Sequence, residues 1–146
     1  MPLVQTPYDG ITGQIIGAAM AVHNELGPGY KERVYQEALS AKLGLASLKF
    51  EEQAAAYVSV AEGKAVTFYL DFLVADQVLV EIKALSHQLT GDELAQVINY
   101  LTALQLPVGL LVNFGRRRLE FKRVFPPKTV QGHQMRLARY HWEPKE

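Results

Sequence analysis

The sequence predicts a single α/β domain, and three observations support this fold class. Two helical patterns precede three strand-like segments, and one helix and two strands follow, so that the order is αα-βββ-α-ββ. The chain of 146 residues is long enough for one domain with a hydrophobic core. Its composition, with 49% hydrophobic and 21% charged residues, is typical of a globular protein.

The first two helices are predicted from apolar residues at helical spacing and from the residues that follow each pattern. One helix begins at residue 9 or 12 and runs to residue 26, where Gly27-Pro28-Gly29 ends it, because Gly favours a helix C-terminus and Pro cannot continue a helix. The other runs from 31 to 43, and Gly44 is expected to end it.

The strands are predicted over residues 49–60, 65–74, 78–84, 108–114 and 119–125. Between the third and fourth strands, Thr90-Gly91-Asp92-Glu93 is a capping box that begins a helix to about residue 104. The fourth strand is almost entirely apolar, as expected of a strand buried on both faces. Together with the third strand and the helix it should form a right-handed βαβ unit.

The segment 67–85 is unusual because two apolar strands carry three charges, Asp71, Glu81 and Lys83. Strand side chains alternate in direction, so the even-numbered residues 68–74 are expected to share one face, opposite Asp71. A three-residue turn over 75–77 sets Asp71 directly across from Glu81, whereas a two-residue turn over 76–77 sets it on the wrong face. The three-residue turn is therefore part of the prediction.

These charges suit a metal site, because burying a charge is costly unless it is paired or binds a metal. The carboxylates of Asp71 and Glu81 and the backbone carbonyl of Ile82 supply the oxygen ligands that Mg²⁺ prefers. Lys83 could orient or deprotonate a water that attacks a phosphodiester. The other interpretation is a salt bridge on a solvated sheet face, since Glu-x-Lys occurs by chance in many chains.

Two helices can add to this site. Gln96 and Tyr100 lie four residues apart and so share a helix face; Gln96 could reach a water or a phosphate and Tyr100 could reach Lys83. Glu32 lies at a helix start and could be a third carboxylate at the metal. The alternatives are a Tyr100 that fills the core and a surface Glu32 that stabilises the helix dipole.

Composition and charge limit the function classes. The chain has no Cys, which excludes thiol catalysis, disulfides and Cys-based zinc sites. No secretory signal and no apolar run long enough for a bilayer are visible, so we expect a cytoplasmic location without membrane contact. Residues 1–115 carry a net charge of −6 and residues 116–146 a net charge of +6. This asymmetry suits a phosphate-binding C-terminal end, or simply attraction between the two halves or between subunits.

Other side chains leave two interpretations open. His23 and His87 could approach the site or be ordinary hydrogen-bonded residues, and His133 and His141 have no metal-ligand spacing. The run 116–118 of three Arg could hold phosphates or serve solubility. Tyr140 and Trp142, in the basic-aromatic tail 126–146, could stack on bases or pack onto the domain.

The motif Gly29-x-x-Glu32-x-x-Tyr35 resembles the signature of the GxxExxY protein family, a branch of the PD-(D/E)xK nuclease superfamily. The resemblance continues through Asp71, Glu81-Ile82-Lys83, Gln96-x-x-x-Tyr100 and Val112-Asn113-Phe114-Gly115, and covers about residues 10–125. Leu70 precedes Asp71, where the superfamily commonly has Pro.

The resemblance implies a restriction-endonuclease-like core, with a central mixed β-sheet flanked by helices, in a single domain over 1–146. It implies a Mg²⁺-dependent nuclease, with Mn²⁺ able to substitute, that acts on nucleic acid, DNA rather than RNA. Glu32, Asp71 and Glu81 would bind the metal, Lys83 would act on the water, and Gln96 and Tyr100 would support them. The alternatives are a non-catalytic binding module on the same fold and a structural oligomer subunit. Because an exposed sheet edge often pairs, a homodimer is expected.

Overall fold

The computed structural model describes residues 6–127 and 140–142. Within them the elements are α1 (Asp9–Leu26), α2 (Glu32–Leu45), β1 (Phe50–Ala61), β2 (Lys64–Val74), β3 (Val78–Lys83), α3 (Gly91–Leu104), β4 (Val108–Asn113), β5 (Glu120–Val124) and β6 (Tyr140–Trp142). The predicted order αα-βββ-α-ββ is confirmed up to β5, and the predicted bounds differ from the observed ones by no more than two residues, apart from the alternative start of the first helix at residue 12.

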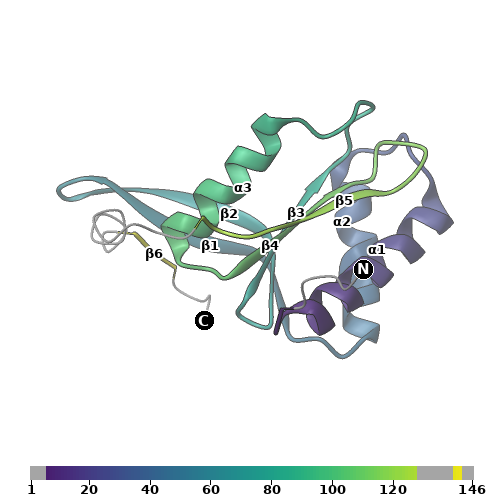
Figure 1. Cartoon of the computed structure of the whole chain (residues 1–146), viewed down its shortest axis with the longest axis horizontal. Helices are drawn as coiled ribbons and strands as arrows, with labels where there is room; N and C mark the ends of the chain where they lie inside the picture. Colours follow the sequence, from purple (N-terminus) through teal and green to yellow (C-terminus); the bar gives the residue numbers. More distant parts are fainter. Residues whose placement is uncertain (1–5, 128–139, 143–146) are drawn as a thin grey trace.

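The strands form one mixed sheet in the order β5-β4-β3-β2-β1-β6. The β3 and β4 strands are parallel and are joined through α3, which confirms the predicted βαβ unit. All other neighbours are antiparallel. Figure 1 shows the long hairpin of β1 and β2 extending to the left, beyond the rest of the sheet.

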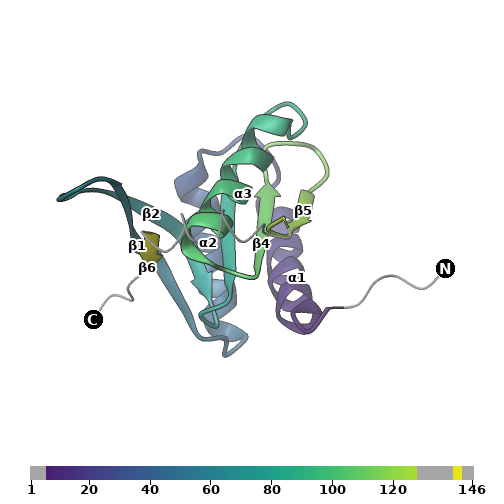
Figure 2. The same cartoon turned by 60° about the vertical axis from the view of Figure 1, so that its left-hand side comes forward.

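Helices cover both faces of the sheet. On one face, Val78, Val80 and Ile82 of β3 pack with buried residues of α1 and α2. On the other face, Leu79 of β3 packs with buried residues of α3. Figures 1 and 2 show α3 on one side of the strands and α1 with α2 on the other. The predicted alternation of side chains along β3 is therefore confirmed.

The start of α3 is the predicted capping box. The Thr90 hydroxyl accepts a hydrogen bond from the Asp92 N–H at 3.2 Å, and the Glu93 carboxylate accepts one from the Thr90 N–H at 2.9 Å. The prediction that Gly44 ends α2 was wrong, because that helix continues to Leu45. The chain turns instead at Ser47, which has a positive φ of 57° and donates its N–H to the Gly44 carbonyl.

The turn between β2 and β3 has the predicted three residues. Phe72 pairs with Val80 and Val74 pairs with Val78, so Ala75-Asp76-Gln77 closes the hairpin. Ala75 and Asp76 have positive φ angles of 53° and 58°, which suit a tight turn. Continuing this register by one residue sets Asp71 opposite Glu81.

The even-numbered residues of β2 do not share one face, contrary to the prediction. Phe72 and Val74 pack with the cluster of α1 and α2, whereas Leu70 packs with α3 and Phe68 contacts the ring of Tyr100. Alternation changes near Gln53 of β1, which faces this part of β2 and has a positive φ of 48°. A residue in the left-handed region interrupts the pleat, so the hairpin beyond it curls over α3.

The last described segment is β6, whose backbone pairs with β1 at Ala56, Tyr57 and Val58. The side chains of Tyr140, His141 and Trp142, and the whole of His133, lie outside what the structure describes, so base stacking stays a prediction. In the described part of the chain, no helix combines the length and the apolarity that crossing a membrane requires.

Tyr35 of α2 connects the two N-terminal helices to the sheet. Its ring is fully buried and stacks on Phe114 with a centroid distance of 4.7 Å. Its hydroxyl donates to the Gly27 carbonyl at 2.6 Å and accepts from the Tyr30 N–H at 3.2 Å. One side chain therefore holds the α1–α2 connection in place, directly before Glu32.

We predict that Tyr35→Phe lowers the free energy of unfolding by about 2 kcal/mol, because two partly buried hydrogen bonds to the backbone are lost. Urea unfolding measures the change. Tyr30→Phe is the matched control, since the Tyr30 side chain is 50% exposed. Equal losses in the two variants would contradict a structural role for the Tyr35 hydroxyl.

Candidate active site

The candidate site lies where β2 separates from β3. The paired register ends at Phe72 and Val80, and Asp71 then contacts β3 with its side chain. The Ile82 N–H donates a hydrogen bond of 2.8 Å to Oδ2 of Asp71. The carboxylate of Asp71 thus lies beside the strand segment that carries Glu81, as the predicted register requires.

Glu81 is a buried acid with an unsatisfied oxygen. Its residue is 7% exposed, and its Oε1 is the buried side-chain atom without a hydrogen-bond partner among the described residues. Burial, together with the nearby Asp71 carboxylate, raises the pKa of Glu81 to about 8, although Lys83 acts in the opposite direction. Ionising two adjacent carboxylates in a poorly solvated place is costly unless a cation lies close to them.

Asp71 is held in the same environment but has more partners. Burial raises the pKa of Asp71 above its ordinary value, while the Ile82 N–H, the Lys83 ammonium and the Gln53 amide act against that rise. These groups all stabilise the ionised form. The aspartate is therefore oriented by hydrogen bonds, whereas Glu81 keeps a free oxygen.

Lys83, Gln96 and Tyr100 form a chain of polar contacts between β3 and α3. Nζ of Lys83 lies 3.4 Å from Oε1 of Gln96, and Nε2 of Gln96 lies 3.3 Å from the Tyr100 hydroxyl. Burial raises the pKa of Tyr100, and the Glu81 carboxylate adds to this rise. Because Lys83 and Glu81 lie on the same face of β3, α3 brings its polar face to the two acids.

Glu32 reaches the neighbourhood from α2, although its side chain is exposed. Burial by the surrounding atoms raises the pKa of Glu32, Lys83 lowers it, and Asp71 raises it again. The charge of Glu32 also raises the pKa of Glu81. In the described segments, however, no three His, Asp or Glu side chains are close enough together to form a ready-made metal cluster.

The point where β2 separates from β3, at Asp71, Glu81 and Ile82, forms a fork whose residues nevertheless fit a divalent cation. Carboxylates and carbonyl oxygens are the donors that Mg²⁺ prefers, and Glu81 has an unpartnered buried oxygen. The N–H and C=O of one strand residue point to the same side. Since the Ile82 N–H points to Asp71, its carbonyl also points to the gap beside β2, beyond the last ladder pair.

Gln53 is a site residue that sequence reasoning missed. Its amide hydrogen-bonds the Asp71 carboxylate, and its Nε2 donates to Oε1 of Gln36 on α2 at 3.1 Å. It is also the β1 residue with a positive φ, and such backbone strain is concentrated at functional sites. A glutamine in an apolar strand was the available signal, but its backbone conformation is not visible in a sequence.

The two histidines within the described part have hydrogen-bonded positions. His23 of α1 is buried, and its Nε2 lies 2.8 Å from the carbonyl of Arg116. Nδ1 of His87 lies 3.0 Å from the carbonyl of Gln88, at the surface. The hydrogen-bonded alternative therefore describes His23, and neither ring contacts Asp71 or Glu81 through these bonds.

Comparisons with known proteins agree with this fold. The family model of the PD-(D/E)XK nuclease superfamily matches residues 9–124, a range that contains every predicted site residue. The crystal structure of SSO0001 is similar, with a TM-score of 0.52, 16% sequence identity and coverage of 90% of this chain. This chain spans only 65% of that protein, so the likeness concerns the fold alone. No curated protein matches the sequence.

These findings confirm the predicted fold class, a restriction-endonuclease-like α/β core with a central mixed sheet flanked by helices. The sequence motif identified the superfamily correctly. The comparisons concern the superfamily as a whole, and they do not distinguish its branches.

We predict that Glu81→Gln becomes more stable than the wild type as the pH rises, in the absence of divalent metal. The pKa of Glu81 is about 8 against an ordinary 4.5, so between these values the folded state keeps a proton that the unfolded chain releases. Wild-type stability therefore falls as the pH rises through this window, and the variant lacks this loss.

The expected gain of the variant is a few kcal/mol at about pH 9, because one pKa unit corresponds to about 1.4 kcal/mol. Urea unfolding in a chelator, at about pH 5 and about pH 9, measures it. A difference between the two proteins that does not change with pH would show that Glu81 titrates normally.

Proposed function

Since the chain belongs to the PD-(D/E)XK nuclease superfamily, we propose that it is a metal-dependent nuclease that hydrolyses phosphodiester bonds, of DNA rather than RNA. One observation carries the proposal: the buried Glu81 carboxylate has an oxygen without a partner, beside a second carboxylate, Asp71. A structural salt bridge would instead have paired that oxygen. A buried polar atom without a hydrogen-bond partner in a native protein is commonly explained by a bound ion or water, or by a catalytic role.

In this proposal Asp71, Glu81 and the Ile82 carbonyl bind Mg²⁺, for which Mn²⁺ can substitute, and Glu32 adds a carboxylate from α2. A divalent ion held there supplies positive charge to the phosphate and lowers the pKa of a bound water. The hydrogen bonds from Ile82 and Gln53 keep Asp71 in its orientation. Glu81 needs no rearrangement, because its free oxygen is already without a competing donor.

The remaining predicted residues act on the water and the substrate. Lys83 lies on the same face of β3 as Glu81, where its ammonium can orient or deprotonate the attacking water. Gln96 contacts both Nζ of Lys83 and the Tyr100 hydroxyl, so it restricts the lysine side chain. Tyr100 and Gln96 are therefore positioning residues for Lys83 and can donate to a phosphate oxygen.

The proposal also includes the family within the superfamily, the extent of the domain and the oligomeric state. The role of Tyr35 in holding the segment before Glu32 supports assignment to the GxxExxY family, whose motif includes both residues. We take residues 1–146 as one domain with its core at about 10–125. The edge strand β5 can pair with a second copy, so a homodimer is included, and the molar mass from light scattering tests it.

We predict that the wild type cleaves labelled DNA in the presence of Mg²⁺ and that Glu81→Ala lowers the rate at least about a hundredfold, because charge stabilisation at a reacting centre typically contributes that much. Asp76→Asn is the matched control, since this exposed carboxylate lies at the turn of the same hairpin and forms an ion pair with Lys49. Labelled RNA in a parallel reaction tests the choice of substrate.

Equal degradation by the wild type and Glu81→Ala, with and without Mg²⁺, would exclude this active site. DNA binding without Glu81-dependent cleavage would favour the non-catalytic module. A crystal soaked in Mn²⁺ gives a second readout that does not depend on activity: anomalous density is expected between Asp71 and Glu81. Density elsewhere, with none at the fork, would contradict the assigned ligands.

A further inference from the structure

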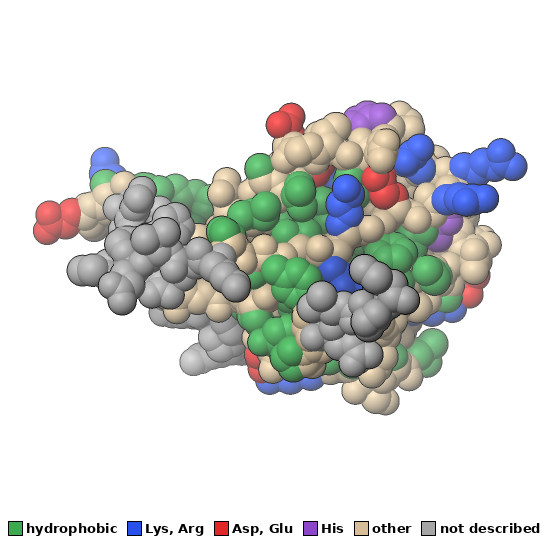
Figure 3. Space-filling view, viewed as in Figure 1, with side chains coloured by type: hydrophobic (Ala, Val, Ile, Leu, Met, Phe, Trp, Pro, Cys, Tyr) green, Lys and Arg blue, Asp and Glu red, His purple; other side chains and the backbone are tan. Residues whose placement is uncertain are grey.

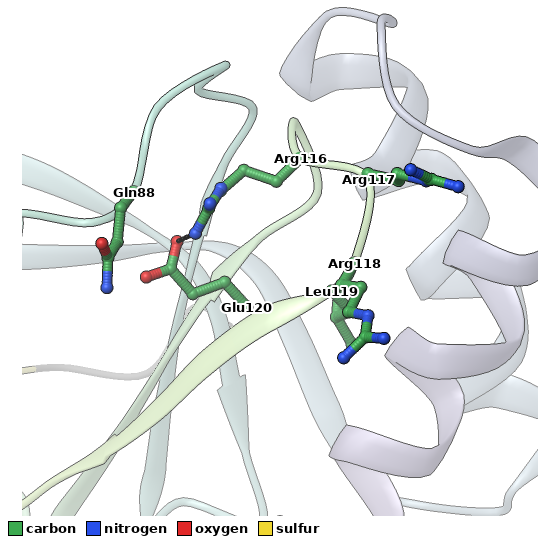
Figure 4. Close-up of a pocket in the computed structure, with 6 residues that line it drawn as sticks. All are labelled: Gln88, Arg116, Arg117, Arg118, Leu119 and Glu120. Atoms are coloured by element: carbon green, nitrogen blue, oxygen red, sulfur yellow. Dashed lines mark ion pairs between the residues drawn. The ribbon is translucent and has the colours of Figure 1, made fainter.

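The loop between β4 and β5 carries three consecutive arginines, Arg116, Arg117 and Arg118. Together with Gln88, Leu119 and Glu120 they line an open pocket of about 430 Å³. In Figure 4, Arg116 extends across the pocket toward Glu120, whereas Arg117 and Arg118 extend from the other side of the loop. Figure 3 shows Lys and Arg side chains gathered at this end of the molecule.

The arginines of the loop differ in how their charge is balanced. Arg116 forms an ion pair with Glu120 at 3.8 Å. Arg117 and Arg118 are exposed, and no carboxylate in the described part of the chain forms an ion pair with either. Two guanidinium groups therefore present unneutralised charge next to one that is already paired.

The base of the loop is held rigidly from two sides. On the α1 side, the ring of His23 bonds to the Arg116 carbonyl at 2.8 Å. On the sheet side, Gly115 lies so close to the backbone of Ala84 and Leu85 that a Cβ at this position would collide with it. The loop therefore leaves the sheet along a fixed path, which only glycine permits at residue 115.

Buried polar bonds also place Glu120. The carboxylate of Glu120 accepts hydrogen bonds from the Leu89 N–H at 3.0 Å and from Nδ2 of Asn113 at 3.3 Å. Asn113 is fully buried, and its Oδ1 accepts from the Leu85 N–H at 2.8 Å. Glu120 is thus occupied by internal donors, and its negative charge directs an incoming anion away from Arg116, toward Arg117 and Arg118.

The arginine loop lies at the same edge of the sheet as the candidate active site. Lys83 at the end of β3 is the ladder partner of Asn113 at the end of β4. Arg116 follows Asn113 by three residues, at most about 10 Å of chain, which is the rise of about three nucleotides. In α/β proteins, ligands bind beyond the carboxyl ends of parallel strands, and β3 and β4 are the parallel pair here.

We propose that Arg117 and Arg118 bind a phosphate of the nucleic-acid strand whose scissile bond lies at Asp71 and Glu81, an inference that rests on the proposed function. The planar guanidinium group donates two parallel hydrogen bonds to phosphate oxygens. A phosphate held a few nucleotides from the reacting centre fixes the register of the strand without reading its sequence.

The test measures binding separately from cleavage. Anisotropy of a labelled single-stranded oligonucleotide is titrated in a chelator, at several salt concentrations, for the wild type and for the double variant Arg117→Ala/Arg118→Ala. We expect binding on the order of tenfold weaker at low salt and a salt dependence reduced by about one to two counterions. Lys49→Ala/Lys64→Ala is the charge-matched control, because both lysines are exposed and lie outside the pocket.

A second variant separates charge from geometry. Arg117→Lys/Arg118→Lys keeps both charges but loses the paired donors, so it should bind more weakly than the wild type with an unchanged salt dependence. An oligonucleotide with a 5′-phosphate, compared with one ending in a 5′-hydroxyl, distinguishes a terminal phosphate from an internal one. Tighter binding of the first assigns the pocket to the strand end, and equal binding assigns it to an internal phosphate.

The outcomes distinguish the two proposals. If Arg117→Ala/Arg118→Ala binds the oligonucleotide as tightly as the wild type, or no more weakly than Lys49→Ala/Lys64→Ala, the pocket is not the phosphate site. This conclusion holds even where cleavage depends on Glu81. If Arg117→Ala/Arg118→Ala weakens binding but Glu81→Ala cleaves DNA as fast as the wild type, the phosphate site stands and the nuclease proposal fails. If the wild type does not bind the oligonucleotide at low salt, the proposed phosphate site is wrong, whether or not the protein cleaves DNA.

Discussion

The burial of the Glu81 carboxylate beside Asp71 is the constraint on which the rest of the site depends. Removing two like charges from water is costly, and the pKa of Glu81 near 8 expresses that cost. The protein does not remove it with a direct salt bridge: Lys83 lies nearby but contacts Gln96. In the proposed function, a divalent ion bound between the two carboxylates would supply the missing positive charge and so stabilise the folded state.

The backbone creates this arrangement by separating two strands that began as a hairpin. The three-residue turn sets the register, and the ladder ends at Phe72 and Val80. Gln53, with its positive φ, interrupts the pleat of β1 across from Asp71, and its side chain connects that aspartate to α2. The same irregularity turns the outer part of the hairpin over α3. Strain, hydrogen bonding and the path of the sheet thus coincide at one point.

The parallel pair β3 and β4 relates this point to the arginine loop. Asn113 bonds to the segment after β3 and to Glu120 of β5, so the two sides of the pocket are joined through one buried amide. Opposite charges therefore lie at separate places along one edge of the sheet. The acids lie at the fork, and the loop carries two guanidinium groups that have no ion-pair partner in the described part of the chain. In the two proposals together, the loop would bind the phosphates of the strand, and the acids would bind the cation that acts on its scissile bond.

Local patterns in the sequence were sufficient for much of this structure. The capping box at Thr90, the turn at Ala75-Asp76-Gln77 and the apolar run of β4 are short-range signals, because each depends on neighbouring residues and on the fixed period of a helix or strand. The position of Asp71 beside the segment of β3 that carries Glu81 followed from the same rules. Glu32, Gln96 and Tyr100 were predicted as site residues from their helical spacing and from the resemblance of their motifs to the GxxExxY family, and their roles stay a prediction.

Only the tertiary structure decided the features that depend on distant segments. The break at Gln53 overrode the simple alternation of β2, so that Leu70 and Phe72 lie on opposite faces of the sheet. The unpaired oxygen of Glu81, the bond from His23 to Arg116 and the occupied state of Glu120 are likewise outcomes of packing. Residue types and spacing thus determined which groups this chain can use. Burial, which arises when helices and strands far apart in sequence exclude water together, decided that Glu81 keeps a raised pKa and, within the described residues, an oxygen without a partner.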